Sequence, residues 1–136
     1  MIVGIGTDRL LISRVAQALA RFGVRFEQRV YTEHELRQAE ARGNTARRLA
    51  MLFAAKEAVA KALGTGFHQG VAPKHIETIH QASGKPEVFL HDGAADAARR
   101  LGVDTVHVSL TDDDGVAMAF AVAESLERSK SGGAGL

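Results

Sequence analysis

Cysteine is absent from this chain of 136 residues. Its absence excludes disulfides, thiolate metal sites and cysteine nucleophiles, so any bound metal must be held by oxygen or histidine ligands. A chain without cysteine also suits a reducing compartment, and we therefore expect a cytoplasmic protein.

Long hydrophobic runs are absent as well. No segment approaches the roughly 20 apolar residues of a membrane-spanning helix, and the N-terminal sequence MIVGIGTD has no basic region ahead of its apolar stretch. We expect neither a membrane span nor export. Aromatic residues make up only 5% of the chain and are not interleaved with the basic residues, which disfavours the binding of nucleic acid by base stacking.

Hydrophobic residues, at 46%, and charged residues, at 24%, match ordinary globular usage. We predict one domain over residues 1–124, followed by a disordered, glycine-rich tail over residues 125–136. The net charge is only +1, but residues 1–66 hold 11 Lys and Arg against 6 Asp and Glu. This basic half favours an acidic partner or a polyphosphate ligand, although a solvated helical face explains it equally well.

Hydrophobic periodicity predicts an α+β fold in which an antiparallel sheet packs against a long central helix. The predicted helices extend from Ser13 to Gly23, Thr32 to Arg42, Ala46 to Leu63 and Asp92 to Leu101. Ser13 and Asp92 are the predicted N-caps of their helices, and the segment from Thr32 to Glu35 predicts a capping box. The predicted strands cover Ile2–Thr7, Ile76–His80, Glu87–Leu90, Thr105–Leu110 and Val116–Glu124. In the last strand the side chains of Ala117, Ala119 and Ala121 are small enough to pack against a neighbouring subunit.

The central helix is predicted to be mostly buried and to end at Gly64, so its charged residues need an explanation. Glu57 and Lys61 stand four residues apart, in the order that favours an ordinary ion pair. Alternatively, Glu57 acts together with Asp8, which follows the first predicted strand. Mg²⁺ is typically held by one or two carboxylates together with water and phosphate oxygens, and lysines nearby would suit a polyphosphate. Asp8 on its own is more commonly a strand-end or turn residue.

Five short segments follow one another in a fixed order: GIGTD at 4–8, ISRV at 12–15, FAAKEAVAKALGTG at 53–66, GKP at 84–86 and HVSLTDDD at 107–114. In this order they resemble the holo-acyl-carrier-protein synthase family of short, single-domain phosphopantetheinyl transferases. The resemblance covers about residues 2–124 and implies the 4′-phosphopantetheinyl transferase-like fold. It also implies a homotrimer with the coenzyme site between subunits.

The implied reaction transfers the phosphopantetheine arm of coenzyme A to a serine of an acyl carrier protein in fatty acid biosynthesis. The serine hydroxyl attacks the β-phosphate of coenzyme A, and adenosine 3′,5′-bisphosphate leaves. No covalent enzyme intermediate is needed, so we expect the protein mainly to position the reactants and to offset the developing charge.

The resemblance also implies roles for individual residues. Asp8 and Glu57 would bind Mg²⁺, and Lys61 and His107 would be the catalytic candidates. The residues implied in coenzyme A binding are Lys56, Lys61, Gly64, Thr65, Gly66, Gly84, Lys85 and Pro86. The residues implied in carrier-protein binding are Arg14, Arg21 and Arg25.

The general base stays open in this interpretation. His107 shares a strand face with Ser109 and Thr111, and it could assist deprotonation or bind a phosphate. A packed, hydrogen-bonded histidine is an equally good interpretation of the same residue, and a metal-bound water or hydroxide is an equal candidate for the base.

Three positions depart from the family pattern. Leu11 stands where an acidic residue is usual, and Leu52 stands where a basic residue is usual. Arg9 stands where an aliphatic residue is common. These departures leave the two metal-binding acids intact but affect the contacts expected with the partner protein or coenzyme A.

A different class of function remains as the alternative. A non-catalytic module could use the basic half of the chain to bind an acidic protein or RNA, and it would need no metal. The low aromatic content argues against RNA as its ligand.

Overall fold

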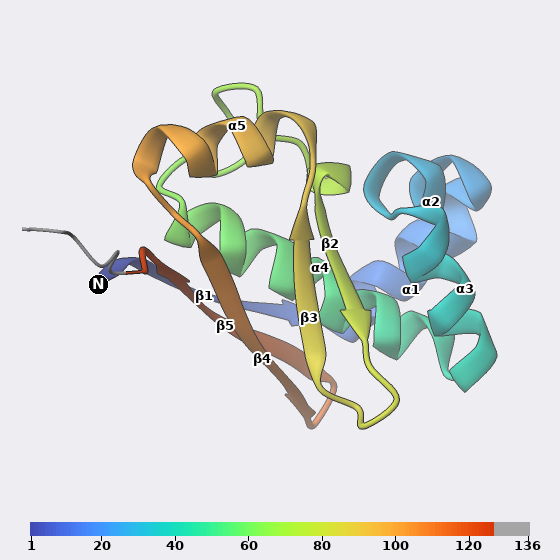
Figure 1. Cartoon of the computed structure of the whole chain (residues 1–136). Helices are drawn as coiled ribbons and strands as arrows, with labels where there is room; N and C mark the ends of the chain where they lie inside the picture. Colours follow the sequence, from blue (N-terminus) through green and yellow to red (C-terminus); the bar gives the residue numbers. More distant parts are fainter. Residues whose placement is uncertain (127–136) are drawn as a thin grey trace, which may run out of the picture.

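The computed structural model describes residues 1–126, and helix α4 (Thr45–Ala62) crosses the middle of the molecule. A three-stranded antiparallel sheet lies along one side of α4, and the other elements cover its remaining sides (Figure 1). The first sheet has the order β1–β5–β4, with β1 at Ile2–Leu11, β5 at Val116–Glu124 and β4 at Thr105–Asp113. The α+β class is therefore confirmed.

The predicted strands are present and form two antiparallel sheets. Strands β2 (Ile76–His80) and β3 (Pro86–Leu90) pair only with each other, in antiparallel register, as a separate hairpin. Strand β3 lies close to β4, but the two are not hydrogen-bonded as ladder partners. Periodicity identified the strands but carries no information on which edges pair.

The remaining helices lie at the two ends of α4 (Figure 1). Helices α1 (Ile12–Phe22), α2 (Val24–Val30) and α3 (Glu33–Arg42) pack around its N-terminal half, and α5 (Asp92–Leu101) follows the β2–β3 hairpin. A single turn of 3₁₀ helix, η1 (Pro73–His75), leads into β2. Helix α2 was not predicted; it has only seven residues, too few to show a clear periodicity.

Several helices and strands begin or end at other residues than predicted. Strand β1 continues past Asp8 to Leu11, because Leu10 and Leu11 pair with β5, so Asp8 lies within the strand rather than after it. Leu11, not Ser13, is the N-cap of α1, and His91, not Asp92, is the N-cap of α5.

Other predicted termini are confirmed. The capping box at Thr32 is present: its hydroxyl accepts a hydrogen bond from the Glu35 backbone N–H, and the Glu35 carboxylate accepts one from the Thr32 N–H. Helix α4 ends one residue before the predicted terminus, and Gly64 has the left-handed φ of +75° expected of a helix stop.

The core lies on both faces of α4 and contains many alanines. One cluster joins α4 to the first sheet and to α5, and a second joins its N-terminal half to α1, α2 and α3. Ala117, Ala119 and Ala121 are buried against α4 within this chain, so they are not available to a neighbouring subunit. The outer face of the same strand instead carries Met118 and Phe120, both more than 40% exposed.

None of the helices within residues 1–126 is long and apolar enough to cross a membrane. Ser125 and Leu126 still form hydrogen bonds, to Met1 and Asp104 respectively. The rest of the predicted tail, residues 127–136, lies outside the described residues.

Candidate active site

Two glycines in β1 allow α4 to lie directly on the strand. A Cβ atom at Gly4 would come within 2.0 Å of the Ala62 carbonyl oxygen, and one at Gly6 within 2.1 Å of the Ala58 carbonyl oxygen. Gly4, Gly6 and Asp8 face the same side of the sheet because alternate residues of a strand do so. Asp8 therefore lies beside the turn of α4 that precedes Ala58, which carries Glu57.

The Asp8 carboxylate has one oxygen with a lysine donor and one without. Its Oδ1 accepts a hydrogen bond from Lys61 Nζ at 3.2 Å, and the same ammonium donates to the Thr7 carbonyl oxygen at 2.9 Å. Its Oδ2 is buried, and within the described part of the chain only a protonated Glu57 carboxyl is placed to donate a hydrogen bond to this carboxylate oxygen. A buried carboxylate oxygen without a partner is costly, so this oxygen is suited to a proton or a cation.

Glu57 is the neighbour that makes this arrangement unusual. Burial, followed by the hydrogen bond and negative charge of Asp8, raises the pKa of Glu57 to about 7, against the opposing charges of Lys61 and Arg14. Two carboxylates in one place cannot both ionise easily, so without a cation the pair retains a proton near neutral pH. A divalent cation would replace that proton and satisfy Oδ2 of Asp8.

Asp8 and Glu57 form a small set of possible metal ligands. No cluster of three or more His, Asp or Glu side chains able to hold a metal occurs within residues 1–126. Two carboxylates suffice for Mg²⁺, which commonly completes its shell with water and substrate phosphate oxygens. Asp8 and Glu57 therefore fit Mg²⁺ brought together with a phosphate-bearing substrate.

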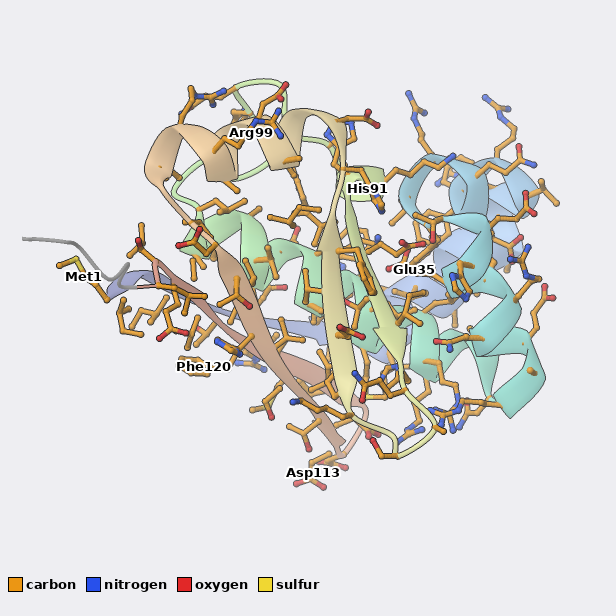
Figure 2. All side chains as sticks on the ribbon, viewed as in Figure 1. Met1, Glu35, His91, Arg99, Asp113 and Phe120 are labelled. Carbon is orange, nitrogen blue, oxygen red and sulfur yellow. The ribbon has the colours of Figure 1, made fainter. Side chains whose placement is uncertain are left out.

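A cavity of about 460 Å³ opens beside Asp8 and Lys61. It continues onto the outer face of the first sheet, where Phe120 projects on the side away from α4 (Figure 2). The lining residues come from β1, α4, β4 and β5, and they are Thr7, Asp8, Arg9, Lys61, Ser109, Thr111, Met118, Ala119 and Phe120. Two cationic side chains, three hydroxyls and an apolar wall suit a ligand with both phosphate and apolar parts.

Glu57 and Lys61 do not form the ordinary ion pair that their spacing allows. The Lys61 ammonium donates to Asp8 and to the Thr7 carbonyl instead, and its positive charge acts on Glu57 only at longer range. Lys61 remains 54% exposed and can reach a ligand in the cavity.

Comparison with known proteins identifies the family of this site. The family model described as the 4′-phosphopantetheinyl transferase superfamily matches residues 4–123. The chain belongs to this superfamily. Holo-[acyl-carrier-protein] synthase of Desulfovibrio desulfuricans is 44% identical over 126 residues, which cover 93% of this chain and 100% of that relative.

Solved structures of the superfamily share the fold. The crystal structure of holo-[acyl-carrier-protein] synthase from Neisseria meningitidis matches with a TM-score of 0.85 and 38% identity, over 92% of this chain and 100% of that one. The structure of the Bacillus anthracis enzyme in complex with CoA (3′,5′-ADP) matches with a TM-score of 0.76 and 32% identity, over 93% and 99%.

Lys56 does not fit the coenzyme contact that its place in the superfamily motif implied. Its side chain is 0% exposed, and its ammonium donates to Glu35 Oε1 at 2.8 Å and to the Ile76 and Pro73 carbonyl oxygens at 2.6 and 3.1 Å. The motif contains two lysines, of which only Lys61 faces the cavity.

The other predicted coenzyme residues do not line the cavity beside Asp8. The Gly64–Gly66 segment directly follows α4, and the Thr65 hydroxyl donates to the Gly66 carbonyl oxygen at 2.8 Å. The Gly84–Pro86 segment forms the turn between β2 and β3. Neither segment lines the cavity, so one chain does not bring together all residues of the predicted binding site.

His107 also stands outside the cavity lining. Its side chain is 59% exposed and its Nε2 lies 3.0 Å from Glu124 Oε1, so it is hydrogen-bonded but not packed. Ser109 and Thr111, on the same face of β4, do line the cavity.

The three arginines predicted to bind the carrier lie on α1 and α2. Arg14 is near enough to Glu57 to lower its pKa, and the Arg21 guanidinium stacks on Phe22 at 5.2 Å. Arg25 lines a separate surface hollow of about 240 Å³ with Phe22, Phe26 and Arg29. The surface of α1 and α2 therefore combines positive charge with the exposed ring of Phe22.

Sequence reasoning missed Met118 and Phe120 as parts of the cavity. Alternation in β5 predicts that they face away from the alanines, so this signal was present in the sequence. The prediction instead placed the contact surface on the alanines of the opposite face.

Proposed function

We propose that this chain transfers the 4′-phosphopantetheine group of coenzyme A to a serine of an apo acyl carrier protein, in fatty acid biosynthesis and in the cytoplasm. The observation that carries the proposal is the buried Oδ2 of Asp8 next to a Glu57 carboxyl whose pKa is raised to about 7 by burial and by Asp8. It occurs within the motifs that the chain shares with holo-[acyl-carrier-protein] synthases.

Asp8 and Glu57 are the residues proposed to hold Mg²⁺. When bound, the ion would neutralise the charge of the coenzyme A pyrophosphate and so favour attack by the carrier serine. Lys61, held at one side of Asp8, binds a phosphate oxygen and stabilises negative charge on the leaving group. Arg9 lines the same cavity and adds a second cation for the phosphates.

His107 remains the proposed second catalytic residue, and the Gly64–Gly66 and Gly84–Pro86 segments remain proposed coenzyme contacts. They lie outside the cavity of their own chain, so these roles require a site formed between subunits. Exposed apolar side chains on the outer face of the first sheet support such an assembly; they are Ile5, Leu11, Met118 and Phe120. We propose a homotrimer, which the mass in solution tests.

The carrier protein is proposed to bind at the surface formed by α1 and α2. Arg14, Arg21 and Arg25 provide positive charge there, and Phe22 is half exposed beside them. An acidic helix next to the serine of the carrier would complement this surface, and Arg14 would then bring the serine towards Glu57.

Mass spectrometry of an apo carrier incubated with coenzyme A and Mg²⁺ tests the proposed function. We expect the carrier to gain the mass of phosphopantetheine, and we expect a chelator to prevent the gain. Carriers from both fatty acid and polyketide synthesis should be included. If none of several apo carriers gains mass, the proposed function is wrong.

A further inference from the structure

Lys56 and Glu35 form a fully buried ion pair on the side of α4 that faces α3 and β2. Both side chains are 0% exposed. All three N–H groups of the ammonium have acceptors, and the ammonium also lies 5.6 Å from the centre of the Tyr31 ring. Figure 2 shows Glu35 in the space between α3 and β2.

The Glu35 carboxylate is equally well bonded. Its Oε1 accepts from Lys56 and from the Thr32 N–H at 3.0 Å, and its Oε2 accepts from the Thr78 N–H at 2.9 Å. Through these bonds, with those of Lys56 to the Ile76 and Pro73 carbonyls, one ion pair joins α3, α4, η1 and the start of β2.

Stability alone does not explain such a pair. The desolvation of two charges offsets most of their attraction, so a buried ion pair contributes little compared with apolar residues of the same size. The use of buried ionic groups that has the best support is to fix one arrangement of the elements that they join.

On the opposite side of α4, the ion pairs that join the helix to the first sheet, Lys61–Asp8 and Arg47–Asp112, are partly exposed, whereas Lys56 and Glu35 are fully buried. The contact with β1 is made at Gly4 and Gly6, which permit close approach but provide no side chains to interlock with the helix. Lys56 and Glu57 are neighbours about 100° apart around the helix. A rotation of α4 that moved Glu57 away from Asp8 would break the hydrogen bonds of Lys56.

We infer that Lys56 and Glu35 are positioning residues that set the rotation of α4, hold Glu57 against Asp8 and thereby set the affinity of this pair for a divalent cation. The inference rests on the proposed metal role of Asp8 and Glu57. It gives Lys56 no contact with coenzyme A, because the side chain is fully buried.

The test measures Mn²⁺ binding by electron paramagnetic resonance, with and without coenzyme A, in the full chain and in the variant Lys56→Met. That variant leaves Glu35 as an unpaired buried carboxylate. The double variant Glu35→Gln/Lys56→Met removes both charges and keeps the inference testable if the single variant does not fold. Circular dichroism and a cooperative melting curve establish folding in each case.

We expect the folded variant to bind Mn²⁺ about tenfold more weakly, as is usual when a residue that orients a metal ligand is lost. We also expect the KM for Mg²⁺ in transfer to rise by a similar factor, with a smaller change in kcat. A loss of folded protein alone would reduce the number of binding sites and leave their affinity unchanged.

The matched control is Arg47→Met. Arg47 also lies on α4, and it forms two hydrogen bonds to the Asp112 carboxylate on β4, at 2.9 and 2.8 Å. This change removes a partly exposed ion pair of the same helix that is remote from Glu57 in sequence, and we expect unchanged Mn²⁺ affinity.

Each outcome distinguishes the two ideas. A folded Lys56 or double variant that binds Mn²⁺ within twofold of the unmodified chain would overturn the positioning role. An unmodified chain that binds no Mn²⁺ would contradict both this role and the metal role of Asp8 and Glu57. Normal Mn²⁺ binding without any modification of apo carriers would contradict the transfer function alone.

Discussion

The charged residues on the two sides of α4 differ in how completely they are hydrogen-bonded. On the side of α3 and β2, Lys56 and Glu35 are completely buried, and both charged groups are saturated with hydrogen bonds. On the side of β1, Asp8 has a buried oxygen that only a protonated Glu57 can satisfy among residues 1–126, and the pKa of Glu57 is raised to about 7. A saturated pair has no capacity for a ligand, whereas the unsaturated pair can gain from a cation.

The largest effect is expected from Glu57→Gln, which removes the charge of the unsaturated side without changing its shape. We expect transfer to fall by about 100-fold or more, because the Mg²⁺ that would offset the charge of the reacting phosphates loses one of its two proposed carboxylate ligands. The fold should persist, since the change also removes repulsion with Asp8. Rates from carrier mass spectrometry and a melting curve provide the measurement.

Glu33→Gln is the control for this change. Glu33 is an exposed residue of α3 that pairs with Arg37, and its replacement should leave transfer unchanged. Full activity of the Glu57 variant at ordinary Mg²⁺ would remove the distinction between the two sides of α4.

A second test moves α4 away from β1 on the side that carries Asp8 and Glu57. In Gly6→Ala the new Cβ atom would collide with the Ala58 carbonyl, so α4 must move away from β1. We expect a loss of about 1–3 kcal/mol in the free energy of unfolding and a clear loss of Mn²⁺ affinity. Denaturant unfolding and Mn²⁺ titration measure the two quantities.

Gly102→Ala provides the comparison for that test. Gly102 follows α5 and has a φ of +75° with open space around it, so alanine there introduces backbone strain without a collision. If both variants bind Mn²⁺ equally well, close packing of α4 on β1 is not what brings Asp8 and Glu57 together.

The titration of Glu57 predicts the direction in which stability and Mn²⁺ affinity change with pH. The pKa of Glu57 is raised from 4.5 to about 7 in the folded chain, so between these values the unfolded chain releases a proton that the folded chain keeps. Without a divalent cation, its contribution to stability therefore falls as the pH rises through this range. Apparent Mn²⁺ affinity should rise over the same range and level off above about pH 7, because the cation competes with the proton.

Mn²⁺ titrations at a series of pH values measure this dependence, with Glu57→Gln as the reference. The reference variant should lose most of the dependence. An equally steep rise in both proteins would assign the proton to another group.

The smallest effect is expected from charges that belong to neither side of α4. Replacing Arg21 and Arg25 by Gln should raise the KM for the carrier by roughly fivefold for each arginine, since an exposed ion pair contributes up to about 1 kcal/mol. The KM for coenzyme A and the Mn²⁺ affinity should not change. Steady-state kinetics at two salt concentrations measure the effect, and Arg100→Gln on α5 is the control.

Local sequence patterns predicted most of the elements because their signals are local. The capping box at Thr32 and the stop at Gly64 each depend on a few adjacent residues, and both are confirmed. The separation into two sheets depends on contacts between distant segments, and periodicity does not specify them.

In the candidate site, too, the contacts between distant segments could not be predicted from local sequence patterns. The pairing of Asp8 with Glu57 was expected from the family motifs, but the role of Gly4 and Gly6 in bringing α4 onto β1 required the packed structure. Lys56 was assigned to the ligand because it lies in the same motif as Lys61. Its partner Glu35 is 21 residues away, and nothing in the sequence between them indicates the contact.

Transfer rates at saturating Mg²⁺, measured side by side for Glu57→Gln and the folded double variant Glu35→Gln/Lys56→Met, test the contrast most directly. If Lys56 and Glu35 only position Glu57, excess Mg²⁺ should return the transfer rate of the double variant to within about threefold of the unmodified chain. The transfer rate of the Glu57 variant should remain about 100-fold or more below it. Recovery of both variants, or a double variant as inactive as the Glu57 variant, would contradict the division between the two sides of α4.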